Sequence, residues 1–186
     1  MRFILLACVP LIFSACCKKI SKPIGQDSQI STPPPVITPL PRFSQTLTVA
    51  DTNHLGQDSL LMLRRTACFG MCPTYDLVIY QNGLVHFLGK NNVDRLGSSY
   101  YMLNDQVWNE IKAAADSANF FKLNHTYPED PKMFIPDLNN TIIMINDAGM
   151  RNQVMDNHGA PAALKKLEVV VDDMLRKLKP IYPENR

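Results

Sequence analysis

Two cysteines, Cys68 and Cys72, are the residues of this 186-residue chain whose type and spacing could most readily do chemistry. In an oxidising compartment such a pair closes a structural disulfide, which for so short a loop adds about 2 kcal/mol of stability in the chain-entropy model. The alternative is a redox-active pair, although those pairs usually have two intervening residues and lie at a helix N-terminus. The spacing here favours the structural disulfide and leaves the thiol–disulfide protein as a second hypothesis.

Other chemistry-bearing side chains do not form a recognisable motif. His86, His125 and His158 are scattered along the chain and lack the paired spacing of metal ligands. The nucleophile elbow, the phosphate-binding loop and the zinc-protease motif are also missing from the sequence. We therefore expect no bound metal, no cofactor and no catalytic residues.

A cluster of carboxylates in a proline-rich loop provides the one enzymatic alternative. Glu129, Asp130 and Asp137 lie close in sequence, and glycosidase-like hydrolysis requires two carboxylates across a cleft. The same residue types are ordinary solvated turn formers, which is the interpretation that we favour. A hydrolase that uses the Asp137 loop remains the third hypothesis.

The composition suits a globular domain and excludes some classes of partner. Hydrophobic residues make up 46% of the chain and the formal net charge is +2. A nucleic-acid-binding protein normally has a clustered basic excess, so we expect no nucleic-acid partner. Beyond the first residues there is no apolar run of roughly 18 residues or more, which a membrane-spanning helix needs.

The N-terminus predicts export and lipidation. A short apolar run, Phe3 to Phe13, follows Arg2 and ends at Ser14-Ala15-Cys16, which is typical of a signal peptide. The tetrapeptide Phe13-Ser14-Ala15-Cys16 resembles the bacterial lipobox, with Phe where Leu is usual. This resemblance implies removal of residues 1–15 and acylation of Cys16, and several acyl chains hold a protein on a membrane. We expect a lipid-anchored envelope protein on the periplasmic or surface face, with the outer membrane favoured over the inner.

Residues 16–57 then predict a flexible tether that follows the lipidated cysteine. Prolines, including Pro33-Pro34-Pro35, are spread among Ser, Thr and Gln without a sustained hydrophobic period. Such a segment cannot bury enough apolar area to offset its ordering entropy, and its prolines favour an extended spacer.

Residues 58–180 predict a single domain, followed by a tail at 181–186. Alternation and turn signals predict strands, and Asn82-Gly83 is a strong hairpin signal. Helical spacing predicts one helix that begins near Asn104 and another that begins at Pro161 and stops at Pro180. Lys165, Lys166, Asp172 and Asp173 are expected on the side of the last helix opposite its apolar stripe. The strands are predicted at residues 60–66, 74–80, 84–88, 98–102, 141–145 and 151–155.

The resulting order, ββββαββα, predicts an α+β fold. Strands joined mainly by hairpins, with the helices set apart, are typical of an antiparallel sheet. We expect about six strands, with both helices packed on one face of the sheet.

The segment Cys-Phe-Gly-Met-Cys-Pro-Thr-Tyr, followed by Leu-Val-Ile-Tyr and Asn-Gly, resembles a family of bacterial domains of unknown function, many of them predicted lipoproteins from Bacteroidetes-type bacteria. The resemblance covers about residues 58–178 and implies no established activity. Members often carry Thr before the Asp that matches Asp137, whereas this chain has Pro136. The matching positions are Arg64, Cys68, Phe69, Gly70, Cys72, Pro73, Tyr75, Gly83, Phe121, Tyr127, Asp137, Pro161, Leu164, Leu167 and Glu168.

The leading hypothesis for function is a non-enzymatic binding or structural domain held on the membrane by its lipid. The cysteine loop presents apolar side chains at the end of a predicted sheet, with a cation nearby. Its partner would be an envelope protein or a glycan. The candidate binding surface consists of Arg64, Phe69, Met71, Pro73 and Tyr75.

Overall fold

The computed structural model describes residues 42–43 and 59–181. These residues belong to one compact unit, Pro39–Arg186. The predicted signal peptide, Cys16, nearly all of the tether and residues 182–186 lie outside the described residues. Within the described ranges, no helix is both long enough and apolar enough to cross a membrane.

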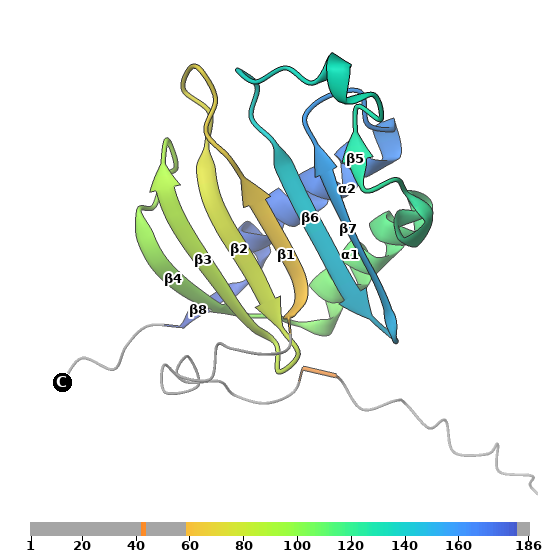
Figure 1. The fold of residues 1–186 in the computed structure, drawn as a ribbon. Helices are drawn as coiled ribbons and strands as arrows, with labels where there is room; N and C mark the ends of the chain where they lie inside the picture. Colours follow the sequence, from red (N-terminus) through yellow and green to blue (C-terminus); the bar gives the residue numbers. More distant parts are fainter. Residues whose placement is uncertain (1–41, 44–58, 182–186) are drawn as a thin grey trace, which may run out of the picture. The chain divides into compact units, whose positions relative to one another are not determined.

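The core of the domain is one eight-stranded sheet in the order β5-β7-β6-β1-β2-β3-β4-β8 (Figure 1). Neighbouring strands are antiparallel except for β5 and β7, which run parallel. The strands are β1 (Ser59–Arg65), β2 (Thr74–Tyr80), β3 (Leu84–Asn91), β4 (Gly97–Met102), β5 (Thr126–Tyr127), β6 (Thr141–Asp147), β7 (Met150–Asp156) and β8 (Lys179–Ile181).

The α+β class is confirmed, but the prediction of an antiparallel sheet of about six strands was wrong: the sheet has eight strands and includes one parallel pair. The two missed strands, β5 and β8, form the edges of the sheet and are too short to show a period of two. Pro180 was expected only to stop the last helix, but it lies within β8 and pairs with Tyr101. An edge strand tolerates proline because one side of it needs no backbone donor.

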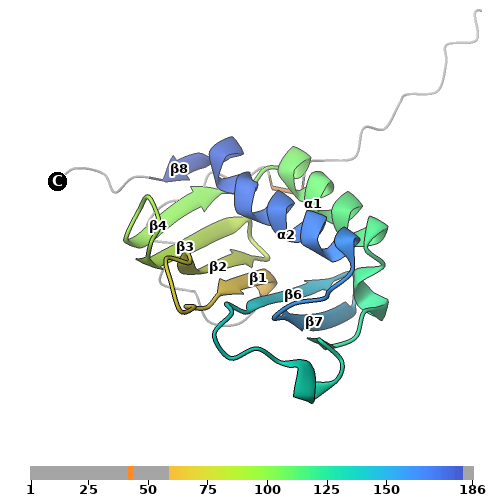
Figure 2. The same ribbon diagram turned by 90° about the horizontal axis from the view of Figure 1, so that it is seen from above.

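Two helices pack on one face of the sheet, as predicted (Figure 2). Helix α1 (Asp105–Ser117) begins where expected, because the side chain of Asn104 accepts a hydrogen bond of 2.9 Å from the Val107 amide. Helix α2 (Ala162–Asp173) continues into the 3₁₀ turn η4 (Met174–Lys177). Two further 3₁₀ turns are η2 (Phe120–Lys122) and η3 (Pro131–Met133).

The alternation along the strands places the core between the sheet and the helices. Inward side chains such as Leu63, Leu77 and Ile143 are fully buried against the α2 stripe of Leu164 and Leu167. Among the residues that the structure describes, none forms a helix on the opposite face of the sheet (Figure 2).

The strand register gathers three loops at one end of the sheet. Arg65, near the end of β1, pairs with Tyr75 of β2 on one side and with Thr141 of β6 on the other. The β1–β2 loop (66–73), the β3–β4 loop (92–96) and the β5–β6 loop (128–140) therefore lie together at the top of Figure 1. We call this end of the domain the loop end.

Candidate functional site at the loop end

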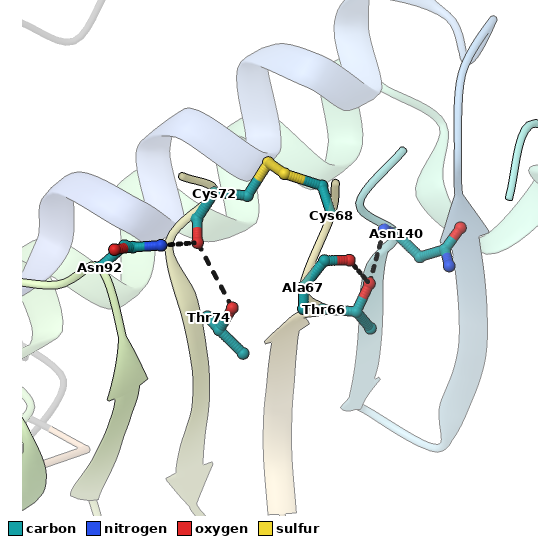
Figure 3. The surroundings of a disulfide bond; sticks show 7 residues. All are labelled: Thr66, Ala67, Cys68, Cys72, Thr74, Asn92 and Asn140. Carbon is teal, nitrogen blue, oxygen red and sulfur yellow. Dashed lines mark hydrogen bonds between the residues drawn. A yellow bond between two sulfur atoms is a disulfide. The ribbon is translucent and has the colours of Figure 1, made fainter. Parts of the chain in front are cut away.

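The cysteine loop, residues 68–72, is closed by a disulfide between Cys68 and Cys72, whose Cα atoms are 5.8 Å apart (Figure 3). It joins β1 to β2, so neither cysteine belongs to the N-terminus of a described helix. That position differs from the one that lowers thiolate pKa in disulfide oxidoreductases. The loop is thus braced covalently at the point where two central strands meet.

Hydrogen bonds also tie this loop to both neighbouring loops. The amide of Phe69 donates to the carbonyl of Asp137 at 3.0 Å. The amide of Asn140 donates to Thr66 Oγ1 at 2.8 Å, and Asn92 Nδ2 donates to the carbonyl of Cys72 at 3.3 Å (Figure 3). Because these contacts cross between loops, the loop end should behave as one connected surface.

Large apolar side chains are exposed on all three loops. Phe69 is 93% exposed and Met71 is 89% exposed, although both sit on a loop that is held in place. Exposed apolar side chains that adjoin one another mark interaction sites, and the three loops that carry these side chains are joined by hydrogen bonds. We define the apolar loop surface as Phe69, Met71, Leu96, Met133, Ile135 and Leu138.

The remaining sequence-predicted binding residues are divided between places. Pro73 is exposed beside the cysteine loop. Arg64 points to the helix-free face and pairs with Asp76 at 2.8 Å, whereas Tyr75 is buried on the opposite, helix-facing side. Tyr75 pairs with Arg65, so Arg64 and Tyr75 are one position apart along the paired strands. Side chains at successive positions project to opposite faces of a sheet. The structure therefore keeps Phe69, Met71 and Pro73 together and separates Arg64 from Tyr75.

An open groove of about 500 Å³ lies below the cysteine loop on the helix-facing side of the sheet. We call it the aromatic groove because aromatic side chains dominate its floor, which consists of Tyr75, Leu77, Phe87 and Tyr101. One wall comes from the end of α2 and from η4, and the other from the β3–β4 loop. The walls carry Asn92, Val93, Asp94 and Arg95 on one side and Asp172, Asp173, Leu175 and Arg176 on the other, with Arg65 and Pro73 at the ends.

Gly89 allows the β3–β4 loop to close over the sheet and form its wall. A Cβ atom at this position would lie 1.9 Å from the carbonyl oxygen of Arg95 and 2.9 Å from Val93 Cγ2. Gly89→Ala is expected to displace that loop and to lower the free energy of unfolding by about 1–3 kcal/mol, measured by urea denaturation. Gly149→Ala is the control: φ there is +78° and nothing lies within 4 Å, so the substitution adds backbone strain without a steric clash. A smaller loss for Gly89→Ala than for this control would contradict the steric argument.

Arg65 organises a polar network beneath the end of α2. Its Nη1 donates to Thr141 Oγ1 at 2.7 Å, and its Nε lies 3.2 Å from both the Tyr75 hydroxyl and Asp172 Oδ1. Its Nη2 also forms an ion pair with Asp172, and the Tyr75 hydroxyl donates to the same carboxylate. Burial, together with the nearby negative charge of Asp172, raises the pKa of Tyr75 well above its usual 10.

A second set of charges lies one turn earlier on α2. Asp156 and Glu168 are both buried, and Lys165 forms an ion pair with Asp156 while its Nζ lies 3.9 Å from Glu168 Oε2. Arg65 Nη2 lies 3.9 Å from the same oxygen. Burial raises the pKa of Glu168 to about 7; Lys165 opposes this rise and the charge of Asp156 adds to it. This carboxyl therefore gains or loses its proton near neutral pH.

The sequence analysis missed this network. Lys165 and Asp172 were expected on the side of the helix opposite the apolar stripe, but Asp172 faces the sheet and contacts Arg65 and Tyr75. The available signal was spacing: Glu168 and Asp172 lie four and eight residues after Leu164, in line with the buried stripe. Two carboxylates on a core-facing row predict buried cationic partners.

The Asp137 loop provides structural contacts. Asp137 contributes its backbone carbonyl to the cysteine loop while its side chain is exposed. Asp130 caps η3 by accepting a 2.9 Å hydrogen bond from the Lys132 amide, and His158 Nε2 lies 2.7 Å from the Met133 carbonyl. These contacts add no support to the hydrolase hypothesis. Across residues 42–43 and 59–181, no group of three or more His, Cys, Asp or Glu side chains could hold a metal ion.

Removal of the disulfide separates its structural role from a redox role. The Cys68→Ser/Cys72→Ser variant is expected to lose about 2 kcal/mol or less of unfolding free energy, because the closed loop is short. Urea denaturation of both forms measures this loss, and redox titration of the parent gives its potential. A potential between about −120 and −230 mV, with unchanged stability on reduction, would contradict the structural assignment and support the thiol–disulfide alternative.

Comparison with known families gives one match. Residues 59–175 match the model of a family that is described as a domain of unknown function, DUF6438. No curated protein matches the chain.

Proposed function

The chain belongs to the DUF6438 family of domains of unknown function, and from this premise we propose that it is a membrane-anchored envelope lipoprotein whose domain binds a partner protein through the apolar loop surface. The observation that carries this proposal is the nearly complete exposure of Phe69 and Met71 on a braced loop. A protein partner with a complementary apolar groove would bury both side chains.

The energetics of the loop suit binding. Burial of one large apolar side chain contributes about 1.5–3 kcal/mol. The disulfide and the bonds from Phe69 to Asp137 and from Asn92 to Cys72 already restrict the loop. Binding therefore requires little further ordering entropy, which is the usual benefit of a preorganised surface.

The position of Arg42 supports an outward-facing loop end. Its guanidinium contacts Asp147 at 2.9 Å and Gln81 at 3.1 Å, and its amide donates to Asp105. Asp147 is the last residue of β6 and Gln81 follows β2, so both lie at the end of the sheet opposite to the loop end. Arg42 therefore lies at the end of the sheet opposite to Phe69, and the proposal takes this end as the one nearer to the membrane.

The lipid anchor is tested with adjacent cysteines. In a bacterial host that processes lipoproteins, Cys16→Ser should abolish incorporation of labelled palmitate and release the chain from the membrane fraction. Cys17→Ser is the matched control and should keep both properties. Equal labelling of the Cys16→Ser variant and the parent would contradict the anchor.

Partner binding is tested by polar replacement on the loop. Phe69→Ser/Met71→Ser should abolish cross-linking of the full chain to its envelope partner without changing its melting temperature, since both side chains are exposed. Met150→Ser/Val169→Ser removes two exposed apolar side chains elsewhere and should leave cross-linking unchanged. Cross-linking that survives the loop replacement would refute the proposal. A cross-linked product made only of two copies of this chain would also contradict it, because it would indicate self-association and not binding to a foreign partner.

A further inference from the structure

We propose that the aromatic groove is a second binding site, which takes a neutral sugar unit of a glycan. No residue of the apolar loop surface lines this groove. Its lining comes from β1, the β1–β2 loop, the inner face of β2, β3 and β4, the β3–β4 loop, α2 and η4. The groove volume of about 500 Å³ falls within the range of small-molecule sites.

The floor of the groove is apolar, and each of its three aromatic side chains is 7–8% exposed. Tyr75 and Phe87 lie with their ring centroids 5.1 Å apart and their planes inclined at 38°, and Tyr101 extends the floor onto β4. The C–H face of a pyranose ring is apolar and packs well on such a surface. Aromatic floors also hold ligands at little entropic cost, because the rings are already fixed by the core.

The charges around the groove argue for a neutral ligand. Three arginines and three aspartates line it, so their formal charges cancel. Arg65 already pairs with Asp172, Arg176 Nη1 lies 3.3 Å from Asp173 Oδ1, and Arg95 Nη1 donates to the Tyr101 hydroxyl at 3.2 Å. An anionic ligand that paired with Arg65 or Arg176 would have to displace Asp172 or Asp173 and leave that aspartate without its partner. The remaining two charges, Asp94 and Arg95, are adjacent in the chain and offset each other.

Neutral hydroxyl groups avoid that cost. A hydroxyl both donates and accepts, so neighbouring sugar hydroxyls can bond the outer lone pairs of Asp173 and the remaining N–H groups of Arg95 while the existing pairs stay intact. Both residues lie on the groove walls, one on each side. A sugar ring on the floor would therefore be held from both walls.

Calorimetric titration of the full chain tests this site. The probes are glucose, N-acetylglucosamine, cellobiose and diacetylchitobiose, with glucose 6-phosphate and trialanine as charged and peptide probes. We expect at least one neutral saccharide to bind with a dissociation constant below about 10 mM, and more tightly than both comparison probes. Lack of binding by all four saccharides, or tighter binding of either comparison probe, would overturn the proposal.

Variants place the binding in the groove. Arg95→Ala and Asp173→Ala should each weaken saccharide binding by about tenfold or more, and Tyr101→Phe, which removes only a hydroxyl, provides a milder test with less risk to folding. Arg151→Ala, an exposed arginine outside the groove, should bind as the parent does. Phe69→Ser/Met71→Ser should also retain saccharide binding, which separates this site from the partner surface. Binding that is unchanged in all three groove variants would refute the assignment.

Discussion

Replacement of Arg65 by methionine is expected to lower the free energy of unfolding by up to about 3–5 kcal/mol, because loss of one partner of a partly buried ion pair leaves the other charge uncompensated. Asp172 would lose its cation, and Thr141 and Tyr75 would each lose a hydrogen bond of the network. Glu168 would also lose a nearby positive charge. Methionine preserves most of the side-chain volume, so the loss measures charge and hydrogen bonding more than packing.

The neighbouring arginine provides a matched control. Arg64 is the next residue on the same strand, but it lies on the helix-free face, where its side chain is 47% exposed and pairs with Asp76. Exposed ion pairs contribute about 0–1 kcal/mol, so Arg64→Met should lower the unfolding free energy by no more than that. Urea denaturation of both variants gives the comparison. Equal losses would show that the network under α2 does not stabilise the fold.

Local signals account for the parts of the fold that the sequence predicted. Asn82-Gly83 forms the expected hairpin turn, since Gly83 has φ of +87° and the Asn82 side chain accepts from the Leu84 amide at 3.0 Å. The first helix begins after Asn104 for a similarly local reason. Such features depend on a few adjacent residues, so one sequence is enough to find them.

Long-range pairing explains what was missed. The edge strand β5 exists because Thr126 and Tyr127 pair with Met155 and Asp156, and no local pattern encodes that contact. The aromatic groove likewise needs residues from β2, β3, β4 and α2 to meet. Conversely, the exposure of Phe69 and Met71 could be predicted from the sequence, because a closed cysteine loop has little space to bury its own side chains.

Glu168→Gln is expected to stabilise the protein above pH 7 and to remove most of the dependence of its stability on pH between about 4.5 and 7. The pKa of Glu168 is about 7 in the folded protein against an ordinary value of 4.5, so the folded state binds the proton more tightly. This contribution to stability is fully present below pH 4.5 and is lost as the pH rises to about 7. The full change is about 3–4 kcal/mol at most, from about 1.4 kcal/mol for each of the 2.5 pH units between the two values.

Urea denaturation from pH 4 to pH 8 measures this dependence, and Glu110→Gln, at an exposed α1 carboxylate paired with Lys177, should leave the slope unchanged. The groups that face Glu168 are Arg65 on β1, Asp156 on β7 and Lys165 on its own helix. A slope that survives Glu168→Gln would show that Glu168 does not bind the proton responsible for it. Helix α2 also carries Asp172 and Asp173, which line the aromatic groove. A change in the charge of Glu168 would therefore alter the electrostatic field of the helix that forms one wall of the groove. A shift in saccharide affinity over this pH range that is lost in Glu168→Gln would connect the buried proton to the binding site.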